Sequence, residues 1–159
     1  MTAPLKPATE RFWRQYLDTA PDADTAQRWF YQAFRLGVTA DDADDGALLV
    51  GRGIKTAASS LLWRYEARHQ PLPQVRSLSI LENGRDEPVC VVRTTELVTR
   101  PFREIDLRFA YDNGEWDRSL KTWRRQYWRI FAAQCEELGR EPDHSMPVVC
   151  QRFRVLFSG

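Results

Sequence analysis

Two apolar runs joined by a tight-turn signal constrain the fold of this chain more than any other feature. Residues 77–81 and 89–98 are rich in β-branched and apolar side chains, and the dipeptide Asn83-Gly84 lies between them. Asn-Gly readily adopts the positive φ values that short hairpin turns need. The sequence therefore predicts a β-hairpin. A third run of this kind, residues 148–157, predicts a final strand near the C-terminus.

The N-terminal half has helical spacing. Phe12, Trp13, Tyr16 and Leu17 form an apolar stripe that predicts one helix. A second helix, capped by Asp24 or Thr25, is expected to stop at Gly37 and to carry four apolar residues on one face: Trp29, Phe30, Ala33 and Phe34.

Two further helices are marked by their ends. Thr39 and Asp42 have the spacing of a short capping box, and the helix they begin breaks at Gly51. A long helix is expected over residues 118–138, ending at Gly139. Between the hairpin and this helix, residues 102–109 predict a short helix and residues 111–117 a polar loop. Helices and strands thus occupy separate blocks, which is typical of an α+β domain.

Bulk properties narrow the class of protein. The length of 159 residues fits one domain, and no apolar run is long enough to cross a bilayer. Residues 1–10 lack the features of a signal peptide. The chain has three cysteines, an odd number, and they are widely spaced. No Cys or His pair has the spacing of metal ligands. We therefore expect a cytoplasmic protein with reduced thiols, no metal site and no cofactor.

The net charge of +1 conceals a segregated distribution. Positions 18–45 hold seven aspartates, whereas positions 118–129 hold five basic residues and no acidic ones. A local phosphate site is therefore compatible with the nearly neutral total, and we expect it to contact few phosphates.

The segment Gly51-Arg52-Gly53-Ile54-Lys55-Thr56 is the first candidate site. Its glycines allow close backbone approach, and Lys55 with the hydroxyls of Thr56 and Ser59 can converge on an anion. The spacing differs from that of a Walker loop. A helix stop followed by a capped helix start explains the pattern equally well.

The long helix is the second candidate. Trp123, Tyr127 and Phe131 share a face that we assign to the core. Cationic residues lie elsewhere, with Trp128 among them, and such a surface can pair with phosphates and stack a base. A solvated face, with Trp128 packed under a loop, is the slightly favoured alternative. The cationic residues are Lys121, Arg124, Arg125 and Arg129.

Glu96 is the third candidate, because a carboxylate near the end of an apolar strand is costly to bury unpaired. It can serve as a general base or form an ion pair with a neighbouring cation. The residues alone favour the ion pair.

In this order, these segments resemble the ASCH domain family. The resemblance covers residues 31–157 and is carried by "GRGIKTAASSLLWRYE", "PLPQVRSLSILENGRDEPVCVVRTTEL", "PFREIDLRFAYDNGEWDRSLKTWR" and "CEELGREPDHSMPVVCQRFRVLF". It implies a PUA-like β-barrel surrounded by helices. We accordingly expect an ASCH-like domain over residues 25–159 and an added N-terminal helical extension over residues 1–24.

The resemblance also implies site residues. Members are regarded as RNA- or nucleotide-binding, some resemble amidohydrolases that deacylate N4-acetylcytidine, and ribonuclease activity has been proposed for others. Lys55 matches the family's G-x-K lysine and Glu96 its strand glutamate, whereas Ala58 replaces the nucleophilic Thr. Relatives often read Gly-Asp-Arg-Ser-Leu where this chain has Trp116-Asp117-Arg118-Ser119-Leu120.

Three functions follow as hypotheses, in descending order. The first is binding of single-stranded RNA or a nucleotide, with ribonuclease activity as an extension. The second is deacylation of an N4-acetylcytidine-type nucleoside, against which Ala58 counts. The third is a non-catalytic protein-interaction module. The catalytic candidates are Lys55, Glu96 and Ser119, and the nucleic-acid-binding candidates are Arg52, Gly53, Thr56, Ser59, Arg118, Lys121, Arg125 and Trp128.

Overall fold

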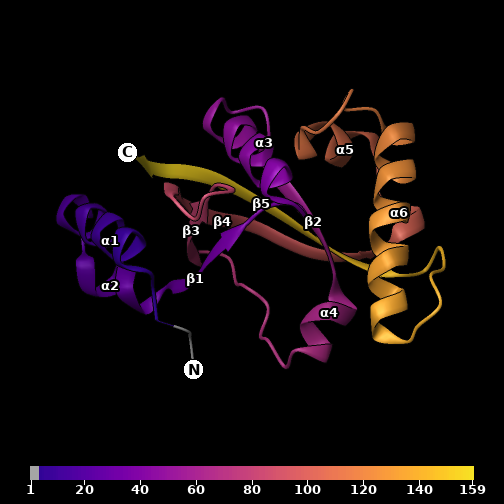
Figure 1. Cartoon of the computed structure of the whole chain (residues 1–159), viewed down its shortest axis with the longest axis horizontal. Coiled ribbons are helices and arrows are strands. Elements are labelled where there is room, and N and C mark those ends of the chain that lie inside the picture. Colours follow the sequence, from indigo (N-terminus) through magenta and orange to yellow (C-terminus); the bar gives the residue numbers. More distant parts are fainter. Residues whose placement is uncertain (1–3) are drawn as a thin grey trace.

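The computed structural model describes residues 4–159 and shows helices gathered around one mixed β-sheet (Figure 1). In chain order the elements are α1 (Pro7–Thr19), α2 (Ala23–Arg28), β1 (Phe30–Arg35), α3 (Ala40–Gly51), β2 (Ala57–Leu61), α4 (Leu62–Ala67), β3 (Leu78–Glu82), β4 (Pro88–Pro101), the 3-10 turn η1 (Phe102–Glu104), α5 (Leu107–Asn113), α6 (Leu120–Leu138) and β5 (Pro147–Ser158).

The sheet has five strands in the order β1-β3-β4-β5-β2. β1 runs parallel to β3, and the other neighbouring pairs are antiparallel. Within residues 4–159, β1 and β2 remain at the two edges, so the sheet is open and the closed barrel that we predicted is not formed. The α+β class is confirmed.

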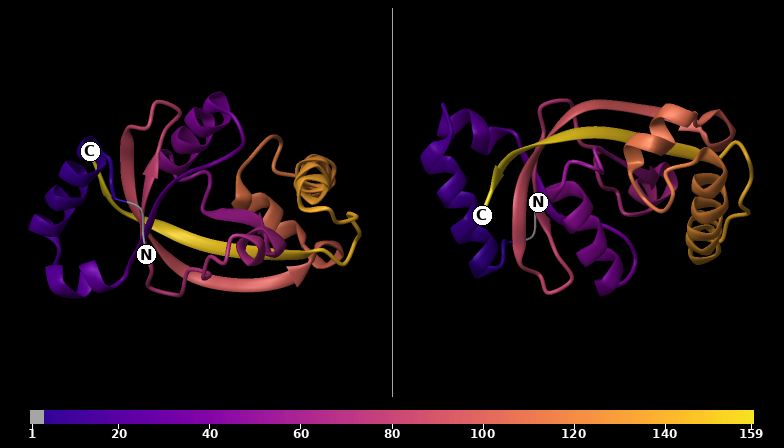
Figure 2. Two further views of the ribbon diagram at one scale, coloured as in Figure 1. Left: turned by 60° about the horizontal axis from the view of Figure 1, so that its bottom comes forward. Right: turned by 90° about the horizontal axis from the view of Figure 1, so that it is seen from above.

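The long strands β4 and β5 form the central axis of the molecule. Their pairing runs from Cys90 opposite Ser158 to Pro101 opposite Pro147. Helices α1 and α2 lie towards one end of this pair, whereas α5 and α6 lie towards the other (Figure 2). A register irregularity between Thr94 and Glu96 sets Glu96 directly opposite Arg152, and such irregularities re-aim side chains.

Three apolar clusters hold the helices onto the sheet. The first packs α5 and α6 against β2 and β5 through residues such as Trp123 and Phe131, each 2% exposed or less. The second packs α1 against β1 and β3 through Phe12 and Trp13. The third lies under α3. The helix α1 thus belongs to the packed structure, and the predicted boundary between residues 24 and 25 stays a prediction.

Elements with strong local signals are confirmed. Helices α1, α3 and α6 form where expected, and both hydrogen bonds of the capping box between Thr39 and Asp42 are present. Gly139 ends α6 in the left-handed conformation with a φ of 68°. The strands of the predicted hairpin correspond to β3 and β4, and the final strand to β5.

The second predicted helix forms only in its first part, because α2 is capped by Asp22, ends at Arg28 and is followed by β1, so the helical prediction for Trp29 to Phe34 is wrong. Phe30 and Ala33 pack into the cluster under α1, whereas Phe34 packs into the cluster under α3. A strand covered on both faces lacks the period-two alternation that would distinguish it from a helix.

The region after the hairpin also differs. Residues 102–109 divide into η1 and the start of α5, which Asp106 caps through the backbone N–H of Phe109. The predicted polar loop is in part the end of that helix.

Candidate functional site

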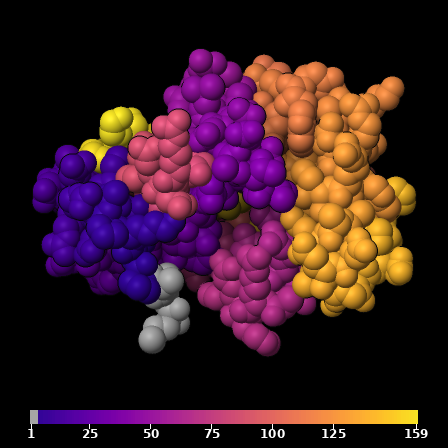
Figure 3. Space-filling model, in the orientation of Figure 1, coloured from indigo at the N-terminus to yellow at the C-terminus, as the bar shows by residue number. Residues whose placement is uncertain are grey.

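Two segments that are distant in sequence pack against each other at the end of the molecule that holds α5. One is the turn Arg52–Thr56 between α3 and β2, and the other is the loop Gly114–Ser119 between α5 and α6. We call this surface the loop junction. The backbone N–H of Thr56 donates to the carbonyl of Asp112 at 2.9 Å. In Figure 3 the surface of α3 and the following turn adjoins that of α5 and its loop.

Gly114 makes this close approach feasible. Its φ is 75°, and a Cβ atom there would lie 2.6 Å from the carbonyl oxygen of Ile54 and 2.7 Å from Cα of Lys55. Any other residue would both strain the backbone and collide with the turn. The contact between the two segments therefore depends on this glycine.

Lys55 belongs to the first segment of the loop junction, and its side chain is almost fully buried, with 2% exposed. Its Nζ donates to Oε1 of Glu115 and to the backbone carbonyl of Asn113, both at 3.0 Å. Burial lowers the pKa of Lys55, and the carboxylate of Glu115 opposes that shift. The ammonium group of Lys55 is therefore hydrogen-bonded to this loop and has almost no contact with solvent.

The carboxylate of Glu115 is held by three donors on one oxygen. Besides Lys55, the side-chain amide of Asn113 and the hydroxyl of Tyr127 donate to Oε1, the latter at 2.6 Å. Burial, with the nearby Glu115 carboxylate, raises the pKa of Tyr127 well above its ordinary value. Its hydroxyl consequently keeps its proton and remains a donor.

Ser59 extends this network to β2. Its hydroxyl donates to Oδ1 of Asn113 at 2.7 Å and accepts from the indole N–H of Trp123 at 3.2 Å. Strand β2, the end of α5 and the core face of α6 are thereby joined through polar side chains. Because the hydroxyl proton is already bonded to Asn113, Ser59 is not poised as a nucleophile.

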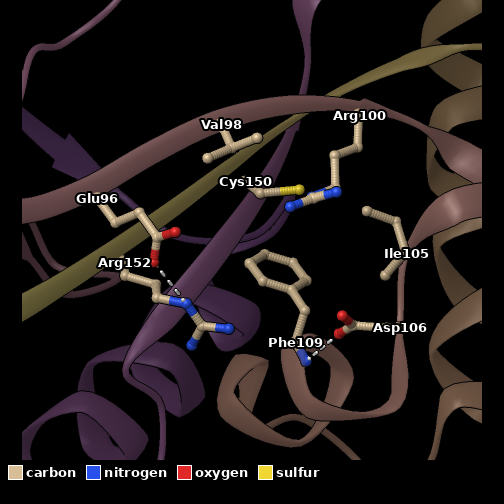
Figure 4. A pocket seen from close by; sticks show the side chains of 8 residues that line it. All are labelled: Glu96, Val98, Arg100, Ile105, Asp106, Phe109, Cys150 and Arg152. Atoms are coloured by element: carbon tan, nitrogen blue, oxygen red, sulfur yellow. Dashed lines mark hydrogen bonds and ion pairs between the residues drawn. The ribbon is translucent and has the colours of Figure 1, made fainter.

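Glu96 lies in a different place from Lys55. Its carboxylate pairs with Nε of Arg152 at 3.1 Å, and Nη1 of Arg152 also contacts Asp112. Glu96 and Arg152 border a cavity of about 60 Å³ beside α5, into which Arg100 points (Figure 4). The ion pair that the residues alone favoured for Glu96 is the arrangement observed, and 54% of the Glu96 side chain is exposed.

A thiol also lines this cavity. The side chain of Cys150 borders it with Val98, Ile105 and Phe109 (Figure 4). Burial raises the pKa of Cys150 to about 12. The thiol is therefore almost wholly protonated near neutral pH and is a poor nucleophile.

Ser119, the remaining catalytic candidate, is the N-cap of α6. Its hydroxyl accepts from the backbone N–H of Thr122 at 3.1 Å and donates to Asp117 at 2.8 Å. Within residues 4–159 no hydrogen bond or ion pair joins Lys55, Glu96 and Ser119 to one another, and their shared catalytic role stays a prediction.

Several predicted binding residues do meet at the loop junction. Arg52 and Gly53 are exposed in its turn, and Thr56 is partly buried at the turn's end. The guanidinium of Arg118 lies 3.5 Å from the ring centroid of Tyr111, and its Nε donates to the carbonyl of Tyr111 at 2.9 Å. This fixes the orientation of Arg118.

The cationic face of α6 is divided. Lys121 and Arg125 are exposed in the first turns of the helix, close to the loop junction in sequence. Trp128 instead stacks on His144, with ring centroids 4.9 Å apart, and meets Phe102 edge-on. Its ring packs under the loop before β5 and is only partly available to a ligand.

Ala58 belongs to the cluster under α3, with Val50 and Phe153. Its neighbour Ser59 faces α5 and α6, as strand alternation requires. A nucleophile at position 58 would therefore project away from the Lys55–Glu115 pair.

Sequence reasoning missed Asn113 and Glu115 as partners of Lys55, and Tyr127 as a partner of Glu115. Tyr127 was assigned to the core, which is also where it lies, since it is 7% exposed. Asn113-Gly114 offered the only local signal, because that dipeptide marks a turn without saying what the turn touches.

Comparison with known proteins supports the resemblance in the sequence. The ASCH domain model matches residues 32–157. The chain belongs to the ASCH domain family. Its fold is therefore the PUA-like fold of ASCH domains, here with an open five-stranded sheet. No curated protein matches the chain.

Two solved structures are similar to this ASCH domain. The ASCH domain from Lactobacillus crispatus JV V101 is 27% identical with a TM-score of 0.88, and the match covers 95% of each chain. A protein of the DUF984 family from Enterococcus faecalis V583 is 24% identical with a TM-score of 0.80, covering 92% of this chain and 86% of the other. The second likeness concerns the fold alone.

Two kinds of feature are absent from residues 4–159. No helix there is both long and apolar enough to cross a membrane. No group of three or more His, Cys, Asp or Glu side chains there is arranged to hold a metal ion.

Proposed function

We propose that this ASCH domain binds single-stranded RNA or a nucleotide at the loop junction. The observation that carries the proposal is the packing of Arg52–Thr56 against Gly114–Ser119. Ile54 and Arg118 are 64 residues apart in sequence, yet the guanidinium of Arg118 lies 3.4 Å from the carbonyl of Ile54. This packing brings Arg118 next to the turn that carries Arg52, a turn that was only a weak candidate from its sequence alone.

Charge distribution supports a phosphate contact there. Arg52 is exposed, and within residues 4–159 its side chain makes no hydrogen bond or ion pair. Arg118 is oriented by Tyr111 and Ile54, which lowers the entropy lost when it binds an anion. Lys121 and Arg125 extend the positive surface onto α6. A few phosphates can thus be contacted without a strongly basic protein.

Lys55 has a supporting role in this proposal. Its side chain is only 2% exposed and its charge is balanced by Glu115. It holds the loop of Glu115 in place and does not touch phosphate. Glu96 lies in the separate cavity beside Arg152, where it is already paired. These positions favour binding over RNA cleavage by Lys55 and Glu96 acting together.

The other two hypotheses receive less support. Deacylation through a hydroxyl lacks a nucleophile, because Ala58 faces α3 and the Ser59 proton is bonded to Asn113. For a protein-interaction module, a contiguous apolar patch would be expected. The exposed large apolar residues are instead spread over several elements: Val38, Leu48, Val75, Leu107, Tyr111, Trp116 and Val155.

The test is RNA affinity with matched arginine variants. A fluorescent single-stranded RNA of about 10 nucleotides is titrated at salt concentrations from about 50 to 200 mM, with binding followed by anisotropy. Arg52→Ala is expected to weaken binding about fivefold and to reduce the salt slope by about 0.7, which corresponds to one lost phosphate contact. Arg14→Ala is the control, because Arg14 is an exposed residue of α1 at the other end of the molecule.

Absence of RNA and nucleotide binding by the wild type, or equal losses in Arg52→Ala and Arg14→Ala, would contradict the proposal. The same RNA, analysed on a gel after incubation, reveals any cleavage. N4-acetylcytidine incubated with the protein and analysed for cytidine tests the deacylase alternative. We expect intact RNA and no cytidine.

A further inference from the structure

The side chain of Glu115 has one oxygen in use and one free. Oε1 accepts from Lys55, Asn113 and Tyr127. Oε2 accepts no hydrogen bond from any residue in 4–159, and 26% of the side chain is exposed. Three donors on one oxygen fix the plane of the carboxylate. The second oxygen is thus an oriented acceptor at the surface.

Trp116 follows directly in sequence and has an unusual backbone. Its φ is 56°, a left-handed conformation that is costly for a bulky residue. The side chain is nevertheless presented outward, with 45% of the residue exposed. Its ring meets the ring of Tyr127 edge-on at a centroid distance of 5.6 Å. Tyr127 therefore touches both the indole of Trp116 and the carboxylate of Glu115.

An exposed indole beside an oriented carboxylate is suited to a planar ring that carries a hydrogen-bond donor. Bases stack on aromatic side chains whatever their sequence, because every base has a π-face. A carboxylate is an acceptor only, so it pairs with an amino group and repels a carbonyl oxygen. The two side chains together can discriminate between bases.

We propose that Glu115 and Trp116 form a base-recognition corner that selects nucleobases with an exocyclic amino group. The base stacks on the indole of Trp116, and its amino group donates to Oε2 of Glu115. The phosphate is held by the neighbouring arginines of the loop junction. The inference rests on the proposed function and adds to it the class of base and the residue that reads it.

The test uses nucleotide pairs that differ in an amino or an oxo group. Cytidine monophosphate is compared with uridine monophosphate, and adenosine monophosphate with inosine monophosphate, by calorimetric titration. The wild type is expected to bind the amino member of each pair about tenfold more tightly, as a hydrogen bond to a charged acceptor implies. Equal affinities within both pairs would contradict base selection by Glu115 and Trp116, but would leave the proposed RNA- or nucleotide-binding function unaffected. Failure of nucleotides and RNA alike to bind removes the proposed function itself.

Two variants separate the roles of the residues. Trp116→Gly suits the left-handed backbone, so the protein stays folded, while both members of each pair bind more weakly in equal proportion. The double variant Lys55→Met/Glu115→Gln removes both charges of the pair together. The amide introduced in place of the Glu115 carboxylate keeps its oxygen against Tyr127 and Asn113 and turns its NH₂ outward, so the preference moves to the oxo base. If the folded double variant still prefers the amino base, Glu115 does not recognise the amino group. If Trp116→Gly leaves nucleotide affinity unchanged, the base does not stack on the indole of Trp116.

Discussion

The Lys55–Glu115 pair and the Glu96–Arg152 pair flank the end of α5 and differ in burial. In the first, 2% of the lysine and 26% of the glutamate side chain are exposed, whereas in the second 54% of the glutamate side chain is exposed. A buried charge depends on its partner, whereas an exposed one can exchange its partner for water. The comparison shows that the first pair maintains the loop junction, while the second borders a solvent-accessible cavity.

The largest effect on stability is expected at Gly114, where the loop backbone packs over the Lys55–Glu115 pair. Gly114→Ala places a Cβ against the backbone of Ile54 and Lys55 at a φ of 75°, and it should lower the free energy of unfolding by about 3 kcal/mol. Gly139→Ala is the matched control, because its φ is 68° but a Cβ there meets nothing within 4 Å. We expect a loss of about 1 kcal/mol for it. If chemical denaturation shows equal losses of unfolding free energy in Gly114→Ala and Gly139→Ala, the close backbone approach at Gly114 does not contribute to stability.

The two glutamates provide the direct comparison of the pairs. Glu115→Gln leaves the ammonium of Lys55 buried without a counter-charge and should cost about 3 kcal/mol. Glu96→Gln breaks an exposed pair and should cost less than about 1 kcal/mol. Urea titrations of both variants measure the difference.

The double variant Lys55→Met/Glu115→Gln sharpens that result. Because both charges leave together, it should be more stable than Glu115→Gln alone. If the double variant is the less stable of the two, an uncompensated charge is not the cause of the loss.

The rate at which Cys150 and Cys90 are alkylated reports how readily each thiol ionises in the folded protein. Burial raises the pKa of Cys150 to about 12 and that of Cys90 to about 11. Native protein should therefore alkylate slowly at pH 8, with rates at these thiols rising about tenfold per pH unit up to their pKa values while the fold persists. Mass spectrometry after iodoacetamide treatment follows each site. Rapid native labelling of Cys150 at pH 8 would show that the cavity beside Glu96 supports a thiolate.

The smallest effect on binding is expected at Trp128. Its ring stacks on His144 and contacts Phe102, so Trp128→Leu should lower stability by about 1 kcal/mol. RNA affinity should change by less than about twofold, since a packed ring offers little surface for a base. A large loss of RNA affinity in folded Trp128→Leu would show that Trp128 contacts the RNA.

Local signals predicted much of this fold, and the exceptions have physical causes. Thr39, Asp42 and Gly139 act within a turn of their own position, so the ends of α3 and α6 could be derived from the sequence. β1 is packed on both faces, which hides its period. Strand β2 has the sequence AASSL, which carries little strand propensity, and it is held by pairing with β5.

The site was predictable only in part for the same reason. The resemblance singled out Lys55, but its partner Glu115 is brought to it by a loop that closes through Gly114. No spacing in the sequence encodes that contact. Glu96 illustrates the opposite case, because its residue context alone favoured an ion pair and Arg152 provides one.

Hydrogen exchange with and without single-stranded RNA tests the central claim most directly, because it observes both regions in one experiment. We expect that RNA slows amide exchange in Arg52–Thr56 and Gly114–Ser119, while the amides around Glu96 and Arg152 keep their rates. Slower exchange around Glu96 and Arg152, with unchanged rates in the two segments of the loop junction, would contradict it.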